Sequence, residues 1–141
     1  MLQFREAQPE DIPALHRVRL SVKENALSDP ARVTPAMYVQ YLSQDGRGWL
    51  CECDDEVLGF SILNLNNNSV WALFVDPAHE QRGIGKQLLT LLVQWAKAQG
   101  ITYIKLSTGV DTRAERFYLK QGWRPLGLTE DGERLFEISL T

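Results

Sequence analysis

The amino-acid sequence predicts an α/β (α+β) fold: a mixed central sheet of about seven strands, flanked by about four helices. Three observations predict it. The hydrophobic residues follow strand and helix periods in the order β-α-α-β-β-β-α-β-α-β-β. A long apolar helix directly follows a strand that ends in Asp-Pro, as in α/β units. The 141 residues, 44% hydrophobic and 23% charged, suit one soluble domain spanning residues 1–141.

The first third of the chain predicts one strand and two helices. The segment LQFREA has a strand pattern, and a helix is expected to begin at Pro9, because proline is favoured in the first helical turn. The breaker LSDPAR ends that helix. A second helix is expected from Thr34-Pro35 to Gly46, in the usual order of cap and then proline. The segment between the two helices is expected to be irregular.

The remaining two thirds predict strands and helices in alternation. WLCEC, VLGFSILNL and VWALFV form an antiparallel meander with turns at DDE and NNN. The next helix has an apolar face from Ile84 to Ala96 and ends at Gly100. ITYIKLS then predicts a buried strand of the βαβ kind, and TRAERFYLKQ a shorter helix that ends at Gly122. WRPLGL and RLFEISL supply the last two strands, around the turn TEDGE.

Charge, hydropathy and cysteine content argue against several classes of function. The net charge of −3 disfavours nucleic-acid binding, and no apolar run approaches the roughly 20 residues of a membrane span. The N-terminal MLQFREAQPED has acids and no apolar stretch before a cleavage site, so we expect no secretory signal and a cytoplasmic location. Cys51 and Cys53 share one strand face and are interpreted as structural. His16 and His79 are isolated, so no metal site is expected.

The stretch VDPAHEQRGIGKQLL places two glycines and two cations at the start of a helix. Glycine weakens a helix, so its presence indicates that something must approach the bare backbone. Unpaired N–H groups at a helix start suit phosphate, and the cations Arg82 and Lys86 oppose the helix dipole unless an anion is bound. A dinucleotide fingerprint would need a small residue at Leu88, and a nucleotide P-loop would need a hydroxyl at Gln87. The sequence therefore predicts a phosphate site of another kind.

Two motifs together resemble the GNAT superfamily of acetyl-CoA-dependent N-acetyltransferases. EQRGIGK is similar to the R/Q-x-x-G-x-G/A loop, with Glu80 at its first position, and DTRAERFYLKQGW is similar to the family's Asn-x-x-Ala-x-x-Phe-Tyr-x-x-x-Gly-Phe. The opening Arg5-Glu6-Ala7, the strand ending FVDP and the element order extend the resemblance over nearly the whole chain. It implies that a primary amine of a small molecule or peptide attacks acetyl-CoA directly in a ternary complex. Acetyl-CoA is the implied co-substrate, and no metal is implied.

The resemblance also implies roles for individual residues. Tyr118 is the implied catalytic residue, which protonates or hydrogen-bonds the departing thiolate, although its helical spacing alone favours a core aromatic. Three strand residues are implied to lie along the pantetheine and to aim an amide at the thioester carbonyl: Leu73, Phe74 and Val75. The loop residues implied to wrap the pyrophosphate are Gln81, Arg82, Gly83, Ile84, Gly85 and Lys86, and Asp111 and Arg113 of the second motif complete the cofactor-binding set.

Three positions depart from the family pattern. Glu80 stands where Arg or Gln is usual, Asp111 replaces Asn, and Ser107 stands where many relatives carry a glutamate base. The motif therefore does not identify the base. Glu24 and Asp29, in the irregular segment, are candidates to bind the acceptor or to take its proton, and a solvated structural role is the alternative interpretation.

The same motifs leave other functions open. One is a non-catalytic acyl-CoA-binding or regulatory domain of the same fold, and another is transfer of a longer acyl group, which depends on the pocket near Phe74. Acids in KENALSDPARVTPAMY and LTEDGE mildly favour a cationic amine as acceptor. Homodimers are common among similar proteins, so a second copy is a candidate partner, whereas nucleic acid and membrane are not expected.

Overall fold

The computed structural model describes residues 1–22 and 33–141, and its centre is a mixed β-sheet. The strands are β1 (Gln3–Glu6), β2 (Gly46–Cys53), β3 (Glu56–Asn64), β4 (Ser69–Val75), β5 (Tyr103–Thr108), β6 (Arg124–Leu128) and β7 (Arg134–Ser139). They lie in the order β1-β2-β3-β4-β5-β7-β6. The helices are α1 (Ile12–Ser21), α2 (Pro35–Ser43), α3 (Ile84–Ala98) and α4 (Arg113–Lys120), with short 3-10 turns η1 (Pro9–Asp11) and η3 (Pro77–His79). The predicted fold class and element order are confirmed.

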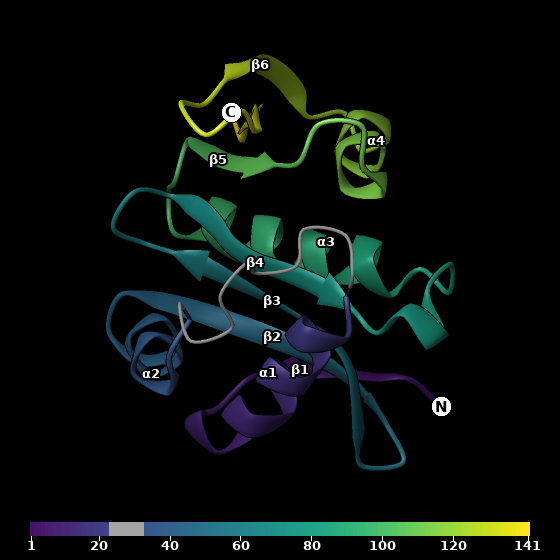
Figure 1. Ribbon diagram of the computed structural model, residues 1–141. Helices are drawn as coiled ribbons and strands as arrows, with labels where there is room; N and C mark the ends of the chain where they lie inside the picture. Colours follow the sequence, from purple (N-terminus) through teal and green to yellow (C-terminus); the bar gives the residue numbers. More distant parts are fainter. Residues whose placement is uncertain (23–32) are drawn as a thin grey trace.

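Helices cover both faces of the sheet and bury an apolar cluster on each. In Figure 1, α1 and α2 lie in front of the sheet and α3 lies behind it. The cluster under α1 and α2 includes Leu15, Tyr38 and Phe60, and the cluster under α3 includes Leu88 and Leu92. Truncating one such buried leucine to alanine typically costs about 2–5 kcal/mol, so the predicted apolar face of α3 is a main source of stability.

Three local predictions differ from the structure. The second helix ends at Ser43 and does not reach Gly46, which is the first residue of β2. The first helix begins with the 3-10 turn η1, and the α-helix starts only at Ile12. The expectation that ITYIKLS is buried throughout is wrong, because Ile104 and Leu106 are buried while Tyr103 and Ser107 are exposed. One face of β5 packs on the core, and the other borders a cavity described below.

The cysteines have the structural placement that the sequence indicates. Cys51 is buried and Cys53 half-buried, both are free, and both pack in the cluster under α3. Burial raises the pKa of the Cys51 thiol, which makes it a poor nucleophile. Over residues 1–22 and 33–141, no three His, Cys, Asp or Glu side chains gather as metal ligands, and no helix is long and apolar enough to cross a bilayer.

The sheet opens between β4 and β5. The described strands share one parallel register pair there, Ser69 with Lys105, next to a 2.9 Å hydrogen bond from the Lys105 N–H to the Asn68 carbonyl. Beyond that point the two strands diverge toward their C-terminal ends (Figure 1). β5 instead pairs along its whole length with β7. β4 therefore presents an unpaired backbone edge inside the sheet.

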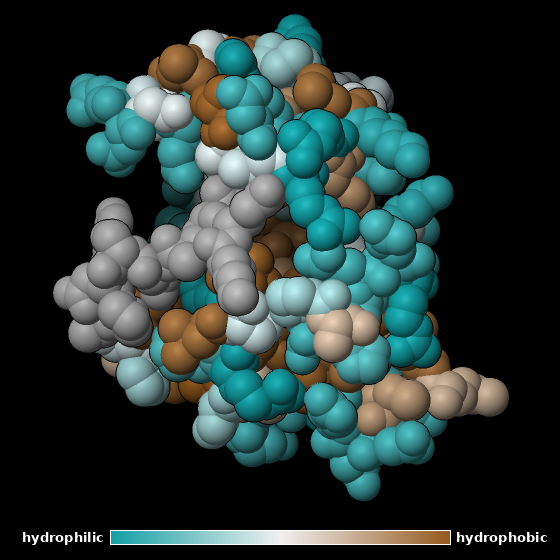
Figure 2. All heavy atoms as spheres, turned by 45° about the vertical axis from the view of Figure 1, so that its right-hand side comes forward, coloured by the Kyte–Doolittle hydropathy of each residue, from teal (hydrophilic) through white to brown (hydrophobic). Residues whose placement is uncertain are grey.

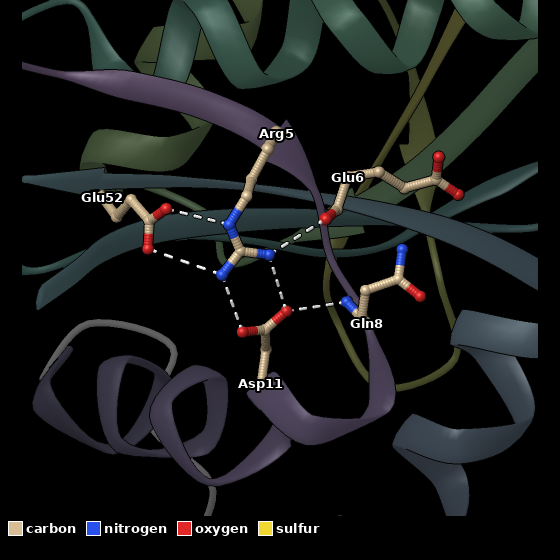
Figure 3. Close-up of polar contacts among 5 residues, drawn as sticks. All are labelled: Arg5, Glu6, Gln8, Asp11 and Glu52. Carbon is tan, nitrogen blue, oxygen red and sulfur yellow. Dashed lines mark hydrogen bonds and ion pairs between the residues drawn. The ribbon is translucent and has the colours of Figure 1, made fainter. Parts of the chain in front are cut away.

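A charged network fixes the N-terminal strand to the start of α1 (Figure 3). Arg5 donates from Nε to Glu52 Oε1 at 2.9 Å, and from Nη1 and Nη2 to the two carboxylate oxygens of Asp11, each at 2.9 Å. The Gln8 N–H also donates to Asp11, at 2.8 Å. The Arg5 guanidinium holds the pKa of Asp11 below its ordinary value. Arg5 thus positions α1, which covers the front face of β3 and β4.

We expect Arg5→Lys to lower the free energy of unfolding by about 1 kcal/mol at neutral pH, because an ammonium cannot replace the fork that binds two carboxylates. A lowered Asp11 pKa contributes stability above about pH 3.8 that is lost as the pH falls through the folded-state pKa. The difference between the two proteins should therefore shrink in urea titrations at about pH 3. Arg124→Lys, in an exposed pair with Glu137, is the control; an equal loss there would contradict the prediction.

Candidate functional site

The first turn of α3 has free backbone N–H groups. Its N-cap residue, Gly83, has a left-handed φ of 78°, and no described side chain caps the helix. The first hydrogen bond of the helix runs from the Gln87 N–H to the Gly83 carbonyl, at 3.1 Å. The N–H groups of Ile84, Gly85 and Lys86 therefore lack intrahelical acceptors and, with the positive end of the dipole, form a site for an anion.

A cavity of about 1040 Å³ extends from this helix start to the open end of β4. A side chain at Gly85 would enter it, because a Cβ there would lie 3.6 Å from Val75 Cγ2 and 3.8 Å from Phe117 Cζ, and both residues line the cavity. Figure 2 shows a hollow on this side of the molecule, with apolar atoms deep inside and hydrophilic residues along its right-hand rim. We call this space the α3 cavity.

Most of the predicted cofactor-binding residues line the α3 cavity. They are Leu73, Phe74, Val75, Gln81, Gly83, Ile84, Gly85, Lys86 and Arg113. Arg82 and Asp111 are not among the lining residues: Arg82 Nη1 lies 3.0 Å from His79 Nδ1, and the Asp111 N–H donates to Glu115 at 3.2 Å. Glu80, the acid at an unusual position, lines the cavity and forms an ion pair with Arg113. The first residue of α4 thus supplies a cation that pairs with the acid of the loop.

The strand pairing of β4 determines which of its backbone N–H groups are free to bind a ligand. The Asp76 N–H donates to the Leu58 carbonyl at 2.8 Å, so the backbone of Asp76 faces β3. Successive residues of a strand face opposite sides, so Phe74 also faces β3, in register with Phe60. The N–H groups of Leu73 and Val75 therefore face the opening between β4 and β5. Of the three predicted strand residues, these two can offer an amide to a ligand.

A second cavity, of about 1020 Å³, lies on the other side of this opening. It shares Leu73, Phe74, Ala114 and Tyr118 with the α3 cavity. Its other walls come mainly from α1, α2, the rest of β4, β5 and the start of β7, and we call it the β5 cavity. Two molecules, one in each cavity, would meet at the open edge of β4 beside Tyr118.

Tyr118 belongs to the core and to the site at once. Its ring packs against Phe117, Trp123 and Phe136, with centroid distances of 5.2, 5.5 and 5.8 Å. The same residue lines both cavities. Burial raises the pKa of the Tyr118 phenol above its ordinary value, so the hydroxyl keeps its proton at neutral pH. The core and functional interpretations of this residue are compatible.

The structure brings a carboxylate to the position where the motif lacks one. Ser107 Oγ donates to Glu133 Oε1 at 3.0 Å, and both residues line the β5 cavity. The β5–β7 register, which pairs Ser107 with Leu135, places the turn before β7 at this point. The sequence interpretation missed Glu133; the available signal was an acidic turn directly before a strand. The other candidates, Glu24 and Asp29, lie outside the described residues.

The charged side chains known to line the β5 cavity are mainly cationic. Arg19 of α1 and Lys105 of β5 supply positive charge, and Glu133 is the carboxylate among the described lining residues. The mild expectation of a cationic acceptor came from acids in two loops. The charges of the described lining residues do not give further support to a cationic acceptor.

Comparisons with known proteins agree with this arrangement. Residues 13–123 match the sequence model of the acetyltransferase (GNAT) family. N-acetyltransferase 8 of Homo sapiens is 30% identical over 97 residues, which cover 62% of this chain and 43% of that protein. Mycothiol acetyltransferase of Amycolatopsis mediterranei (strain U-32) is 31% identical over 135 residues, covering 83% and 42%. The chain therefore spans less than half the length of these two curated relatives.

A solved structure shares the fold at low sequence identity. The PaiA N-acetyltransferase of Thermoplasma acidophilum, crystallised in complex with coenzyme A, superimposes with a TM-score of 0.86 at 20% identity. The alignment covers 99% of each chain. The similarity therefore extends to the strands on both sides of the opening.

Proposed function

The chain belongs to the acetyltransferase (GNAT) family, and we propose that it transfers an acetyl group from acetyl-CoA to a primary amine of a small molecule or peptide. The observation that carries this proposal is the meeting of two cavities at the open edge of β4, beside Tyr118. This arrangement suits direct attack in a ternary complex, in which alignment of two reactants can contribute roughly 7–11 kcal/mol. We further propose that residues 1–141 form one catalytic domain.

The residues of the α3 cavity fit coenzyme A. The N–H groups of Ile84, Gly85 and Lys86 would bind the pyrophosphate, and Gly85 leaves the room that it needs. The edge N–H groups of Leu73 and Val75 would pair with the pantetheine amides and with the thioester carbonyl oxygen. One preorganised donor of that kind contributes roughly 3 kcal/mol. Because Arg82 contacts His79, we propose that the loop binds phosphate mainly through its backbone.

We propose that two side chains handle the protons of the reaction. Bound acetyl-CoA supplies the thioester carbon that the amine attacks. An alkylamine has a pKa near that of lysine, about 10.4, and must lose a proton first. We propose that Glu133, hydrogen-bonded to Ser107, takes this proton directly or through a water molecule. Tyr118 then protonates or hydrogen-bonds the departing sulfur, and the raised pKa of its buried phenol favours the hydrogen bond.

The alternative is a non-catalytic acyl-CoA-binding domain, suggested by Glu80, Asp111 and Ser107. The pairing of Glu80 with Arg113 and of Ser107 with Glu133 favours the catalytic interpretation. The cytoplasmic location, a homodimer and the preference for acetyl over longer acyl groups stay predictions.

Calorimetric titration with acetyl-CoA, followed by thiol release with a panel of amines, tests the proposed function. Binding with thiol release from at least one amine is expected. Binding without release from any amine would favour the non-catalytic alternative. Failure to bind acetyl-CoA would contradict both.

Tyr118→Phe is expected to lower kcat about tenfold while leaving the affinity for acetyl-CoA nearly unchanged. The effect is below the usual range of roughly 100- to 10,000-fold for acid catalysis, because a thiol of pKa about 8.5 is already a good leaving group. Phenylalanine keeps the ring contacts with Phe117, Trp123 and Phe136, so the fold should be retained. Steady-state thiol release measures kcat, and equal turnover would return Tyr118 to a purely structural role. Tyr41→Phe, in α2 and outside the lining of both cavities, is the matched control.

A further inference from the structure

Arg19 is a half-buried cation whose guanidinium has incomplete hydrogen bonds. Its Nε and Nη1 atoms are buried, and neither has a hydrogen-bond partner within residues 1–22 and 33–141. Each of the two donor edges of a guanidinium includes one of these atoms. Buried donors without acceptors are unfavourable, and buried charges normally have a partner of opposite sign. The side chain therefore stands at the wall of the β5 cavity with unused binding capacity.

The described surroundings do not supply a counter-charge to Arg19. The titratable group that acts on it most is the Tyr38 phenol, whose pKa burial raises, so that it is neutral at neutral pH. Burial also lowers the pKa of Arg19 itself, which shows that its environment disfavours the charge. An arginine nevertheless stays protonated at neutral pH. An anionic ligand in the β5 cavity would supply the charge that the described protein groups lack.

Aromatic rings hold this guanidinium close to the reaction point. Its central carbon lies 4.7 Å from the centroid of Phe74 and 5.3 Å from that of Trp71. Phe74 lines both cavities, and its neighbours Leu73 and Val75 carry the N–H groups that face the opening. A group bound to Arg19 therefore lies near the amine that attacks. The anion and the amine of one acceptor would be separated by only a few bonds.

We propose that the acceptor is a small amine that also carries an anionic group, a carboxylate or a phosphate, which pairs with Arg19. This inference rests on the proposed acetyl transfer and names its acceptor class. The charges of the β5 cavity suit such a molecule, because Arg19 would bind the anion while Glu133 faces the amine. This proposed class takes the place of the mild expectation of a cationic amine.

Paired amines test the proposal in the presence of acetyl-CoA. β-Alanine and 4-aminobutyrate carry a carboxylate at two spacings, phosphoethanolamine carries a phosphate, and propylamine and putrescine carry no anion. We expect kcat/KM to be at least about tenfold higher for one of the anionic amines than for propylamine and putrescine. The comparison of β-alanine with phosphoethanolamine identifies which anion is preferred. Equal or better use of propylamine or putrescine would overturn the proposal.

Substitution of Arg19 tests whether this residue binds the anionic group of the acceptor. Arg19→Gln should reduce the preference for the anionic amine over propylamine at least about tenfold, mainly through KM, and Arg19→Lys should retain part of it. Arg47→Gln is the matched control, because its guanidinium also stacks on an aromatic ring, 4.9 Å from the centroid of Trp95, and lines neither cavity. A preference that survives in Arg19→Gln would overturn the assignment.

A stability measurement separates binding from a structural role. Arg19→Met keeps apolar contact with Trp71 and Phe74 but removes a buried charge, so its melting temperature should rise by a few degrees. Arg47→Met should not show this rise, because Arg47 is paired with Glu6. A lower melting temperature for Arg19→Met would mean that Arg19 serves the fold, and would overturn the proposal.

Failure of this inference can be told apart from failure of the proposed function. If acetyl-CoA binds and propylamine or putrescine releases thiol at least as efficiently as the anionic amines, the result supports the proposed acetyl transfer and contradicts the anion site. If acetyl-CoA does not bind, the proposed function falls. If acetyl-CoA binds and no amine reacts, β-alanine and phosphoethanolamine are titrated calorimetrically into the protein with coenzyme A. Binding that Arg19→Gln weakens would support the anion site. No binding would overturn it.

Discussion

Gly85→Val is expected to weaken acetyl-CoA binding at least about 100-fold, which corresponds to about 2.7 kcal/mol. The new Cβ would stand 3.6 Å from Val75 Cγ2, an ordinary contact, so the protein itself can accept it. The two further methyl groups must then occupy the space in front of the free N–H groups of α3. The loss should therefore appear in ligand affinity and spare the fold.

The stability of this variant supports the same distinction. Gly85 lies within α3, where valine has a better helix propensity than glycine, so the melting temperature should be unchanged or higher. Calorimetric titration with acetyl-CoA measures the affinity, and thermal unfolding measures the stability. A variant that keeps its melting temperature and loses the ligand has lost the site alone.

Gly127→Val, at an exposed glycine of β6, is the matched control. A Cβ at Gly127 meets no atom within 4 Å, and this residue lines neither cavity. The affinity of the control for acetyl-CoA should therefore equal that of the wild type. Unchanged affinity in Gly85→Val as well would contradict the phosphate site at α3.

The elements of the fold follow from local patterns that the sequence displays directly. The apolar face from Ile84 to Ala96 predicts a helix against the sheet, and Gly100, at a φ of 84°, ends it as expected. The opening between β4 and β5 could not be predicted in this way, because periodicity reports which face of a strand is buried and not which strand lies beside it. That opening depends on the full pairing of β5 with β7.

The residues of the site also differ in whether the sequence alone predicts them. The glycine loop was predictable because bare backbone beside a helix start has a chemical reason that can be recognised locally. Glu133 reaches the site only through the register of β5 and β7, and Arg19 only through the packing of α1 on β4. The sequence also could not predict the direction of the Arg82 side chain, because its contact with His79 depends on the conformation of the loop. Contacts of this kind require the folded chain.

Glu133→Gln is expected to lower kcat about 100-fold at pH 7, more than Tyr118→Phe does. The reason is that the attacking amine needs help with its proton more than the departing thiolate does. An amine of pKa about 10.4 is neutral in only roughly one molecule in a thousand at pH 7, whereas a thiolate leaves readily without help. Glutamine keeps the shape of the side chain and can still accept the hydrogen bond from Ser107, so the change removes the base and little else.

The pH dependence of this variant separates proton transfer from mere positioning. As the pH rises toward the pKa of the amine, solvent supplies more of the neutral amine, so the deficit of Glu133→Gln should shrink in thiol-release assays between about pH 7 and pH 10. A residue that only shaped the β5 cavity would show the same deficit at every pH. Glu137→Gln, in the strand β7 that follows Glu133 and paired with Arg124 outside both cavities, is the control and should match the wild type throughout. A deficit that is constant with pH would remove Glu133 from the proton path and leave water as the acceptor of the amine proton.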